Sequence, residues 1–341
     1  MFSACEPESL RPVEYQEDVF ILESTFPLDK PGRALAVARA NGVTAALVAR
    51  EFSSDVQVIA IDGTTWTDLS SAAVPEGPRA VCAAGDAVFV ASTADASVSS
   101  FRFDGLRLRP SWSSQFASPP TSIACADFDG DGMVDAFVSA GLAEEATAGI
   151  LDGATSAFEA LPAAHVSDVR VGDMDADGDP DALAVSTTHS TLQILRNENG
   201  GLEVLHALTL DCKSPRAATV FRTVEGSTSF AVACDGAVVI VERPLSTAPG
   251  VAIVDAPARL YDIASLADSS VPAGLSVVSI ESHELLVAPP SLEGWTPYGL
   301  ARGPVAIAVV DVQPDNYPDL IVLSLEQRRL SLFVNQRGNA P

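Results

Sequence analysis

The stretch "ADFDGDGMVDAFVSA" at residues 126–140 places four aspartates within nine positions, directly before an apolar run. The same arrangement returns at residues 172–186 as "GDMDADGDPDALAVS", and the two acidic segments start 46 residues apart. Carboxylates packed this closely repel one another, so their recurrence at a fixed place before an apolar run indicates a repeated structural unit.

Weaker copies of this pattern lie on both sides of the two acidic segments. Seven units begin near residues 34, 79, 122, 167, 216, 260 and 305, with a period of 43 to 49 residues. Each unit contains four short apolar or alternating runs bounded by Gly, Asp, Asn and Pro, which is typical of strands. Four strands per period of about 40–50 residues favour a propeller blade. We therefore predict an all-β fold, a seven-bladed β-propeller with four antiparallel strands per blade.

The seventh unit has only three predicted strands before the chain ends. Residues 17–24, "EDVFILES", form an additional strand before the first unit, and we expect this strand to pair with residues 330–335 and close the ring. Closure would protect an edge that otherwise invites aggregation. The propeller would then span residues 17–341, and residues 1–16 would form an N-terminal tether.

Composition excludes several classes of partner. The 341 residues are 47% apolar, which suffices for a large core, and the net charge is −25 with only two lysines. A nucleic-acid binder needs a basic footprint, and an anionic membrane surface attracts basic segments, so neither partner is expected. No apolar run is long enough to form a transmembrane segment.

The acidic segments have the spacing of a cation-binding loop, with side-chain oxygens at alternate positions, one main-chain carbonyl and a final aspartate. Calcium accepts six to eight oxygen ligands in such flexible arrangements, and the absence of cysteine thiolate and imidazole from the segments disfavours zinc or copper. An EF-hand would need a glutamate at the twelfth position, where Val138 and Ala184 stand. A solvated acidic turn is the alternative, but it predicts neither fixed spacing nor recurrence. The predicted ligands are Asp127, Asp129, Asp131, the Met133 carbonyl and Asp135; Asp173, Asp175, Asp177, the Asp179 carbonyl and Asp181; and, in a weaker third loop, Asp311, Gln313, Asp315, the Tyr317 carbonyl and Asp319.

The segments "DFDGDGMVDAFV" and "DMDADGDPDALAV" resemble the FG-GAP/VCBS family, the integrin-α-like seven-bladed propellers. Two units match this family strongly, the seventh matches moderately, and the others match by period alone. The resemblance implies calcium as the cofactor and places each calcium loop between the first and second strands of a blade. A clear Phe-Gly…Gly-Ala-Pro element is absent, so the chain is more similar to the bacterial VCBS type than to integrins.

The five cysteines allow both an anchor and disulfides. "FSAC" at residues 2–5 is similar to the end of a bacterial lipobox, which makes Cys5 a candidate lipid anchor, although a chance tetrapeptide is the alternative. Cys212 and Cys234 lie at the adjoining ends of a predicted hairpin, so we expect a disulfide between them. Cys82 and Cys125 lie on inner strands of neighbouring units, and their pairing remains open at this stage.

No catalytic arrangement of Ser, His, Asp or Cys is recognisable, so we do not expect an enzyme. The leading hypothesis is a calcium-stabilised binding or scaffold module for a protein or glycan, secreted or held in the bacterial envelope as a lipoprotein. A polysaccharide lyase or hydrolase is one alternative, and an envelope assembly or adhesion protein is another. Candidate contacts on loops of one face are Phe52, Trp112, Phe116, His165, His189 and Tyr298, several of which could instead pack beneath neighbouring loops.

Overall fold

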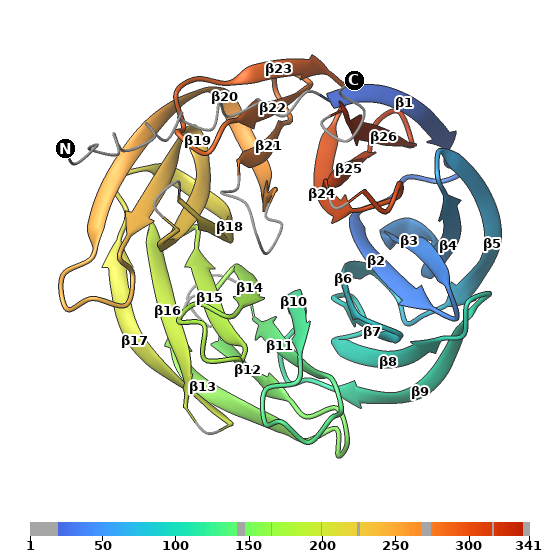
Figure 1. The fold of residues 1–341 in the computed structure, drawn as a ribbon. Coiled ribbons are helices and arrows are strands. Elements are labelled where there is room, and N and C mark those ends of the chain that lie inside the picture. The colour runs from blue at the N-terminus through green and yellow to red at the C-terminus, as the bar shows by residue number, and fades with distance from the viewer. Residues whose placement is uncertain are drawn as a thin grey trace, which may run out of the picture.

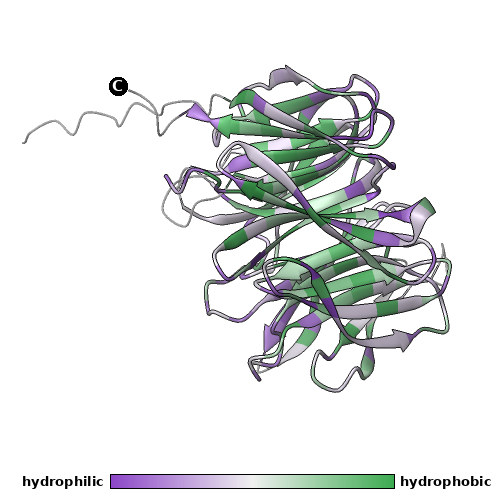
Figure 2. Cartoon of the chain, turned by 90° about the vertical axis from the view of Figure 1, so that its right-hand side faces the viewer, coloured by the Kyte–Doolittle hydropathy of each residue, from purple (hydrophilic) through white to green (hydrophobic). Residues whose placement is uncertain are grey.

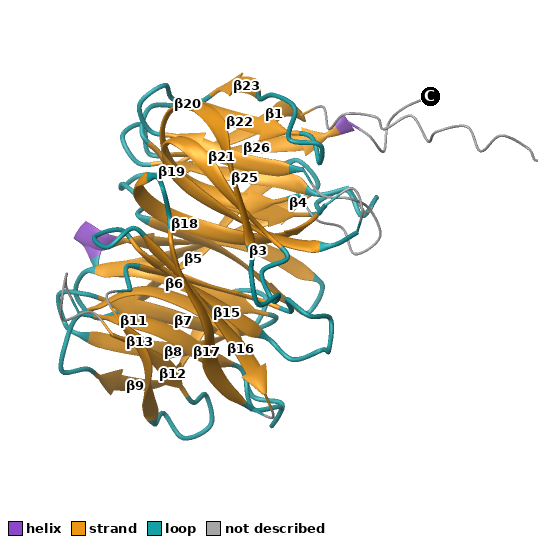
Figure 3. Ribbon diagram, turned by 90° about the vertical axis from the view of Figure 1, so that its left-hand side faces the viewer, coloured by secondary structure: helices purple, strands orange, loops and turns teal. Residues whose placement is uncertain are grey.

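The computed structural model describes residues 20–141, 147–164, 166–198, 200–223, 226–266, 274–315 and 317–336. Nearly all of the regular structure is β-strand, and a short 3-10 helix, η1 (Glu51–Ser53), lies between two strands (Figure 3). In this described part, no helix has the length and apolar character needed to cross a membrane.

Five sheets contain four antiparallel strands each. In spatial order they are β2 (Ala34–Ala40), β3 (Val43–Arg50), β4 (Asp55–Asp62) and β5 (Thr65–Ala73); β6 (Pro78–Ala84), β7 (Ala87–Ser92), β8 (Ser97–Phe103) and β9 (Leu108–Gln115); β10 (Pro120–Ala126), β11 (Asp135–Ala140), β12 (Thr147–Leu151) and β13 (Phe158–Ala164); β14 (Asp168–Gly172), β15 (Asp181–Ser186), β16 (Thr191–Glu198) and β17 (Gly201–Thr209); and β24 (Pro304–Val310), β25 (Asp319–Ser324), β26 (Arg329–Asn335) and β1 (Phe20–Pro27).

The remaining sheet has six strands, whereas the sequence predicts two separate blades in this region. Its order is β18 (Lys213–Arg222), β19 (Thr228–Glu242), β20 (Gly250–Ser265), β21 (Leu275–Ser279), β22 (Glu284–Ala288) and β23 (Thr296–Gly299). β19 takes in two predicted strands, and β20 joins the last predicted strand of one unit to the first of the next. The pairing continues across the expected boundary because Asp235 pairs with both Lys213 and Arg259.

The sheets are arranged around a central axis, with the first strand of each on the inside (Figure 1). These inner strands contact one another in a closed circuit that runs β24, β2, β6, β10, β14, β18, β20 and back to β24. The architecture is therefore a β-propeller.

Burial explains why the second strands are continuous apolar runs. Every residue of β11, β15 and β25 is buried, because both faces of these strands pack against neighbouring sheets. The core is divided into clusters between adjacent sheets, such as the one that joins Phe89 to Val138. Apolar residues accordingly occupy the stacked interior of the strands, and polar residues gather toward the loops (Figure 2).

The expected closure by the N-terminal strand is present. β1 pairs antiparallel with β26, from Phe20 opposite Asn335 to Pro27 opposite Arg329, and the two strands lie side by side in Figure 1. Tyr298 of β23 supports this closure, because its hydroxyl accepts a hydrogen bond of 3.2 Å from the Phe20 main-chain N–H. Residues 17–19 of the predicted strand lie outside the described residues.

Two disulfides join strands near the axis. Cys212–Cys234 fastens the residue before β18 to β19, as the hairpin expectation requires, with its Cα atoms 6.1 Å apart. Cys82–Cys125 links β6 to β10, with a Cα separation of 5.8 Å. The second bond therefore ties together the inner strands of two neighbouring sheets.

Closure predicts a contrast between two adjacent residues of β1. Phe20 is 3% exposed and packs edge-to-face on Tyr298, whereas Ile21 points outward and is 47% exposed. Phe20→Ala should lower the free energy of unfolding by about 3 kcal/mol, because it leaves a cavity between the closing sheet and strands β20–β23 of the sheet before it. Ile21→Ala should cost less than about 1 kcal/mol. Equal, small losses in urea unfolding would contradict closure through this strand.

Candidate functional site

The three acidic loops occupy equivalent places in three sheets. Residues 127–134 connect β10 to β11, residues 173–180 connect β14 to β15, and residues 311–318 connect β24 to β25. Because each loop joins the first strand of its sheet to an antiparallel second strand, all three loops lie on the same face of the ring.

The first loop brings three of its predicted ligands together. Carboxylate oxygens of Asp127, Asp129 and Asp135 lie within 4.8 Å of one another. Asp131 and Met133 are exposed, and the Asp131 side chain accepts a hydrogen bond of 2.6 Å from the Met133 main-chain N–H. Oxygen donors at this separation suit a hard cation such as calcium.

Main-chain hydrogen bonds hold the first carboxylate in place. One oxygen of Asp127 accepts from the Gly130 N–H at 2.9 Å, and the other accepts from the Gly132 N–H at 3.0 Å. Gly130 and Gly132 have φ values of 73° and 86°, a region that side chains with a Cβ rarely adopt. The glycines of the motif therefore allow the chain to turn around the carboxylate.

The second loop has the same local design, but a different set of its aspartates converges. Here the oxygens of Asp173, Asp175 and Asp177 lie within 4.8 Å of one another, without Asp181. Asp173 accepts from the N–H groups of Ala176 and Gly178, matching the turn in the first loop. Arg196 contacts Asp175 at 2.8 Å and thereby partly neutralises this loop.

The third loop is less convergent. Within residues 311–319, apart from Asn316, which the structure does not describe, no three carboxylates approach one another in this way. Asp315 accepts a hydrogen bond of 2.9 Å from the Tyr317 N–H, so its side chain is used in a turn. Gln313 and Tyr317 are partly buried within the same loop.

The last aspartate of each motif has a role that the sequence did not reveal. Asp135, Asp181 and Asp319 are only 1–2% exposed. In each, one carboxylate oxygen accepts from the second residue of the loop, and the other accepts from a residue within two positions of the end of the third strand, at 2.7–2.9 Å. The loop donors are Phe128, Met174 and Val312, and the distant donors are Gly153, Asn197 and Asn335.

These buried carboxylates therefore act as braces within their sheets. An asparagine 16 residues after the aspartate, at Asn197 and Asn335, is the sequence signal that could have revealed the arrangement. Asn197 also donates 2.8 Å to the Phe128 carbonyl, which connects one sheet to the acidic loop of the sheet before it.

Burial raises the pKa of all three bracing carboxyl groups, and that of Asp319 reaches about 6. The main-chain N–H donors oppose this rise, whereas nearby acidic groups such as Asp129 beside Asp135 add to it. The loops thus concentrate negative charge next to a partly desolvated carboxylate, where positive charge would be stabilising.

The candidate contacts predicted for the opposite face do not form one exposed group in the structure. Trp112 lies within β9 and Tyr298 within β23, rather than in loops, because both side chains complete aromatic packing, with Phe89 and with Phe20 respectively. Phe116 packs against Phe158 with ring centroids 4.9 Å apart.

Phe52 of η1 and His189 remain exposed on this face. Phe52 is 82% exposed, which makes it the most prominent of the candidate contacts. His165 and Cys5 lie outside the described residues. The hydrogen bonds recorded for His206 and His283 join these rings to the main chain, at the Ser246 carbonyl and the Gly303 N–H.

Comparison with known proteins supports the class of fold. No family model and no curated protein sequence matches the chain. Among solved structures, the chain is similar to BBS1N from its complex with ARL6DN (TM-score 0.71, 14% identity, covering 94% of this chain and 98% of that one). It is also similar to hydrazine synthase of Kuenenia stuttgartiensis (0.68, 11%, 94% and 99%) and to virginiamycin B lyase of Staphylococcus aureus (0.63, 10%, 93% and 99%).

These likenesses identify the chain as a member of the β-propeller class. At identities of 10–14% they define the fold alone.

The bracing role predicts a loss of stability that does not depend on metal. Asp319→Ala leaves the part-buried N–H group of Val312 and the buried N–H group of Asn335 without their acceptor. In buffer containing EDTA, it should lower the free energy of unfolding by about 2 kcal/mol or more. Asp62→Ala, at the exposed end of β4, removes the same charge and should stay within about 0.5 kcal/mol of the parent protein. Indistinguishable variants in chemical denaturation would rule out the brace.

Proposed function

We propose that this chain is a seven-bladed β-propeller of the bacterial VCBS type, that its acidic loops bind calcium, and that it serves as a binding or scaffold module outside the cytosol. The observation that carries the proposal is the convergence of Asp127, Asp129 and Asp135, repeated by Asp173, Asp175 and Asp177.

The distribution of the core supports seven blades. Each buried cluster lies between two consecutive units of the predicted repeat, and the circuit of clusters includes one between the first and last units. One cluster, which contains Phe221 and Leu286, lies between the two halves of the six-stranded sheet. This packing of the two halves against each other supports counting them as two blades, although β19 and β20 run on continuously between them.

Charge and donor chemistry support calcium. Without a cation, three carboxylates within 4.8 Å repel one another, and a dication turns that repulsion into coordination. The first two loops would hold the ion with Asp127, Asp129, Asp131, Asp135 and the Met133 carbonyl, and with Asp173, Asp175, Asp177, Asp181 and the Asp179 carbonyl. The third loop, with Asp311, Gln313, Asp315, Asp319 and the Tyr317 carbonyl, would be a weaker site.

Thermodynamic linkage supports a location outside the cytosol. A site with a dissociation constant of roughly 0.1 mM, in about 1 mM calcium, stabilises the fold by about 1.4 kcal/mol, and it contributes almost nothing where free calcium is far lower. The two disulfides also suit an oxidising compartment. In this proposal Cys5 carries a lipid anchor, residues 1–16 form the tether and residues 17–341 form the propeller.

A binding role is supported by the fold and by an exposed residue on the face opposite the acidic loops. The neighbour BBS1N was solved in complex with ARL6DN, so a propeller of this shape can bind a protein. Phe52 is an exposed apolar contact on this face of the present chain. The partner would be a protein or a glycan. The alternative of a lyase or hydrolase is supported only by the enzyme names of two other neighbours.

Calcium binding predicts a thermal shift that depends on two loop aspartates. Chelation should lower the melting temperature of the parent protein by roughly 2 °C for each occupied site. Asp129→Ala combined with Asp175→Ala should remove most of this sensitivity, because each loop loses one of its converging carboxylates.

A matched control separates calcium coordination from loss of charge. Asp62→Ala combined with Asp211→Ala removes two exposed carboxylates outside the loops and should leave the calcium response intact. The calcium proposal fails if chelation does not move the melting temperature of the parent protein, or if both double variants respond alike.

The binding role predicts that the two faces behave differently. Immobilised protein, tested on a glycan array and in pull-downs from envelope extract, should retain a specific partner less well after Phe52→Ala. Leu106→Ala is the control, because Leu106 is also exposed but lies in the turn between β8 and β9, on the other face. Equal loss in both variants, or no specific partner in either assay, would count against this role.

A further inference from the structure

A cavity of about 370 Å³ lies on the axis of the ring, on the face opposite the acidic loops. It is lined by residues at the beginnings of the innermost strands, together with Gly141, Thr187 and Thr188 from loops between second and third strands. Its volume is within the range of small-molecule sites in proteins, roughly 300–1,000 Å³.

The lining of this cavity is unusually basic for the chain. The protein has 45 acidic and only 20 basic residues, yet the cavity is lined by Arg33, Arg79, Arg170 and Arg216 and by only two acidic residues, Asp168 and Asp262. The four arginines come from four different blades of the proposed ring, so the ring itself brings them together. The local excess of positive charge opposes the charge of the molecule as a whole.

Arg170 is neutralised by both carboxylates. It contacts Asp168 at 3.0 Å and Asp262 at 2.8 Å, and Asp262 also accepts a hydrogen bond from the Ile307 N–H. Although burial favours the neutral guanidine, the two carboxylates raise the pKa of Arg170, which therefore stays charged. This group braces β14 against β20 across the cavity.

The side chains of the other three arginines make few or only long polar contacts with the described residues. Among the described residues, the Arg79 side chain makes no hydrogen bond or ion pair. Arg33 has one long contact through Nε, 3.9 Å from Glu51, and Arg216 has one of 3.6 Å to Asp235, too long for a hydrogen bond.

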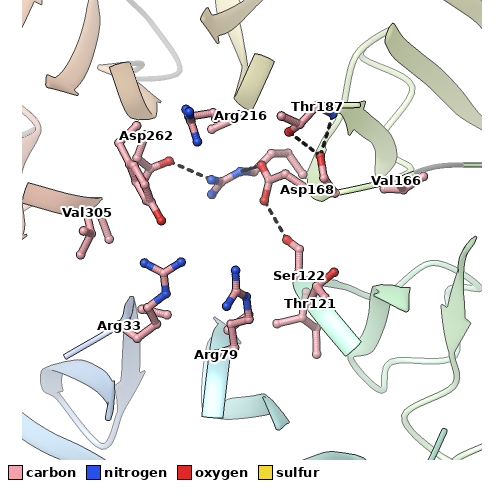
Figure 4. A pocket seen from close by; sticks show the side chains of 18 of the residues that line it. Arg33, Arg79, Thr121, Ser122, Val166, Asp168, Thr187, Arg216, Asp262 and Val305 are labelled. Carbon is pink, nitrogen blue, oxygen red and sulfur yellow. Dashed lines mark hydrogen bonds and ion pairs between the residues drawn. The ribbon is translucent and has the colours of Figure 1, made fainter. Parts of the chain in front are cut away.

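Arg33 and Arg216 are also placed by the same aromatic ring. Their guanidinium carbons lie 5.7 and 5.8 Å from the centre of the Tyr261 ring, which positions both side chains through cation–π contacts. Figure 4 shows Arg33 and Arg79 extending from one side toward the middle of the cavity. The terminal N–H groups of Arg33, Arg79 and Arg216 thus remain available to a ligand.

We propose that this axial cavity binds a small organic molecule through a carboxylate or phosphate group, which Arg33, Arg79 and Arg216 hold. Guanidinium groups suit both oxyanions because their paired N–H donors match two oxygens at once. Thr121, Ser122 and Thr187 also line the wall, but their hydroxyls are already hydrogen-bonded to Ser139, Asp168 and the Pro215 carbonyl, so recognition of the ligand rests on the three arginines. This site is separate from the acidic loops and does not depend on calcium.

Three probes with the same sugar ring test the proposal: glucose, glucuronate and glucose 6-phosphate. Calorimetric titration of the full chain, at about 0.15 M ionic strength in calcium buffer, keeps long-range charge effects screened. At least one anionic sugar should bind at one site per chain, and glucose should not. Glucuronate and glucose 6-phosphate distinguish a carboxylate from a phosphate ligand.

Arg79→Gln and Arg216→Gln should each weaken binding by about tenfold or more, the loss expected for a charge-assisted hydrogen bond. Arg222→Gln removes an exposed arginine from the same strand as Arg216 and should leave binding unchanged. The Arg79 side chain makes no hydrogen bond or ion pair with the described residues, so its replacement should not move the melting temperature.

The proposal is overturned if neither anionic sugar binds or if glucose binds equally well. It is also overturned if Arg79→Gln and Arg216→Gln bind the anionic sugar as tightly as the parent protein and Arg222→Gln do. The calcium response of the parent protein is measured separately by melting, so failure of anion binding and failure of calcium binding are distinguishable.

Discussion

The crowding of carboxylates at the start of the second strands is the constraint around which this propeller is organised. Asp135, Asp181 and Asp319 are buried, and each accepts main-chain hydrogen bonds from its own loop and from near the end of the third strand of its sheet. The loop is thereby held against the sheet, and in the first two loops three aspartates also converge. The structure gains a fixed turn and incurs electrostatic repulsion, which a bound dication would relieve.

The alternating direction of the strands separates the acidic loops from the arginine-lined cavity. The pairing of β1 with β26 joins the last sheet to the first segment of the chain. Because first and second strands are antiparallel in every sheet, the acidic loops collect on one face, and the beginnings of the inner strands converge on the other, around the arginine-lined cavity. In the two proposals, cations would bind on one face of this strongly acidic chain and an anion on the other, so that neither site neutralises the other.

Most of the fold could be predicted from local patterns in the sequence. The repeat of the aspartate motif predicted the acidic loops and the strands beside them, and the missing strand of the last unit predicted closure by β1. The continuous pairing of β19 and β20 was not predictable, because it depends on how Asp235 meets Lys213 and Arg259. Trp112 and Tyr298 were assigned to loops because their aromatic partners are distant in sequence. The convergence of Arg33, Arg79 and Arg216 could not be predicted for the same reason, since only the arrangement of the blades around the axis brings these residues together.

The central claim is that cations occupy the acidic loops, and counting bound calcium tests it most directly. Parent protein stripped with EDTA would be brought to equilibrium by dialysis against calcium near 1 mM, a concentration at which sites of the proposed affinity are mostly filled. The account predicts two strongly bound calcium ions per chain, with a third at partial occupancy. A calcium content no greater than that of the surrounding buffer would contradict it.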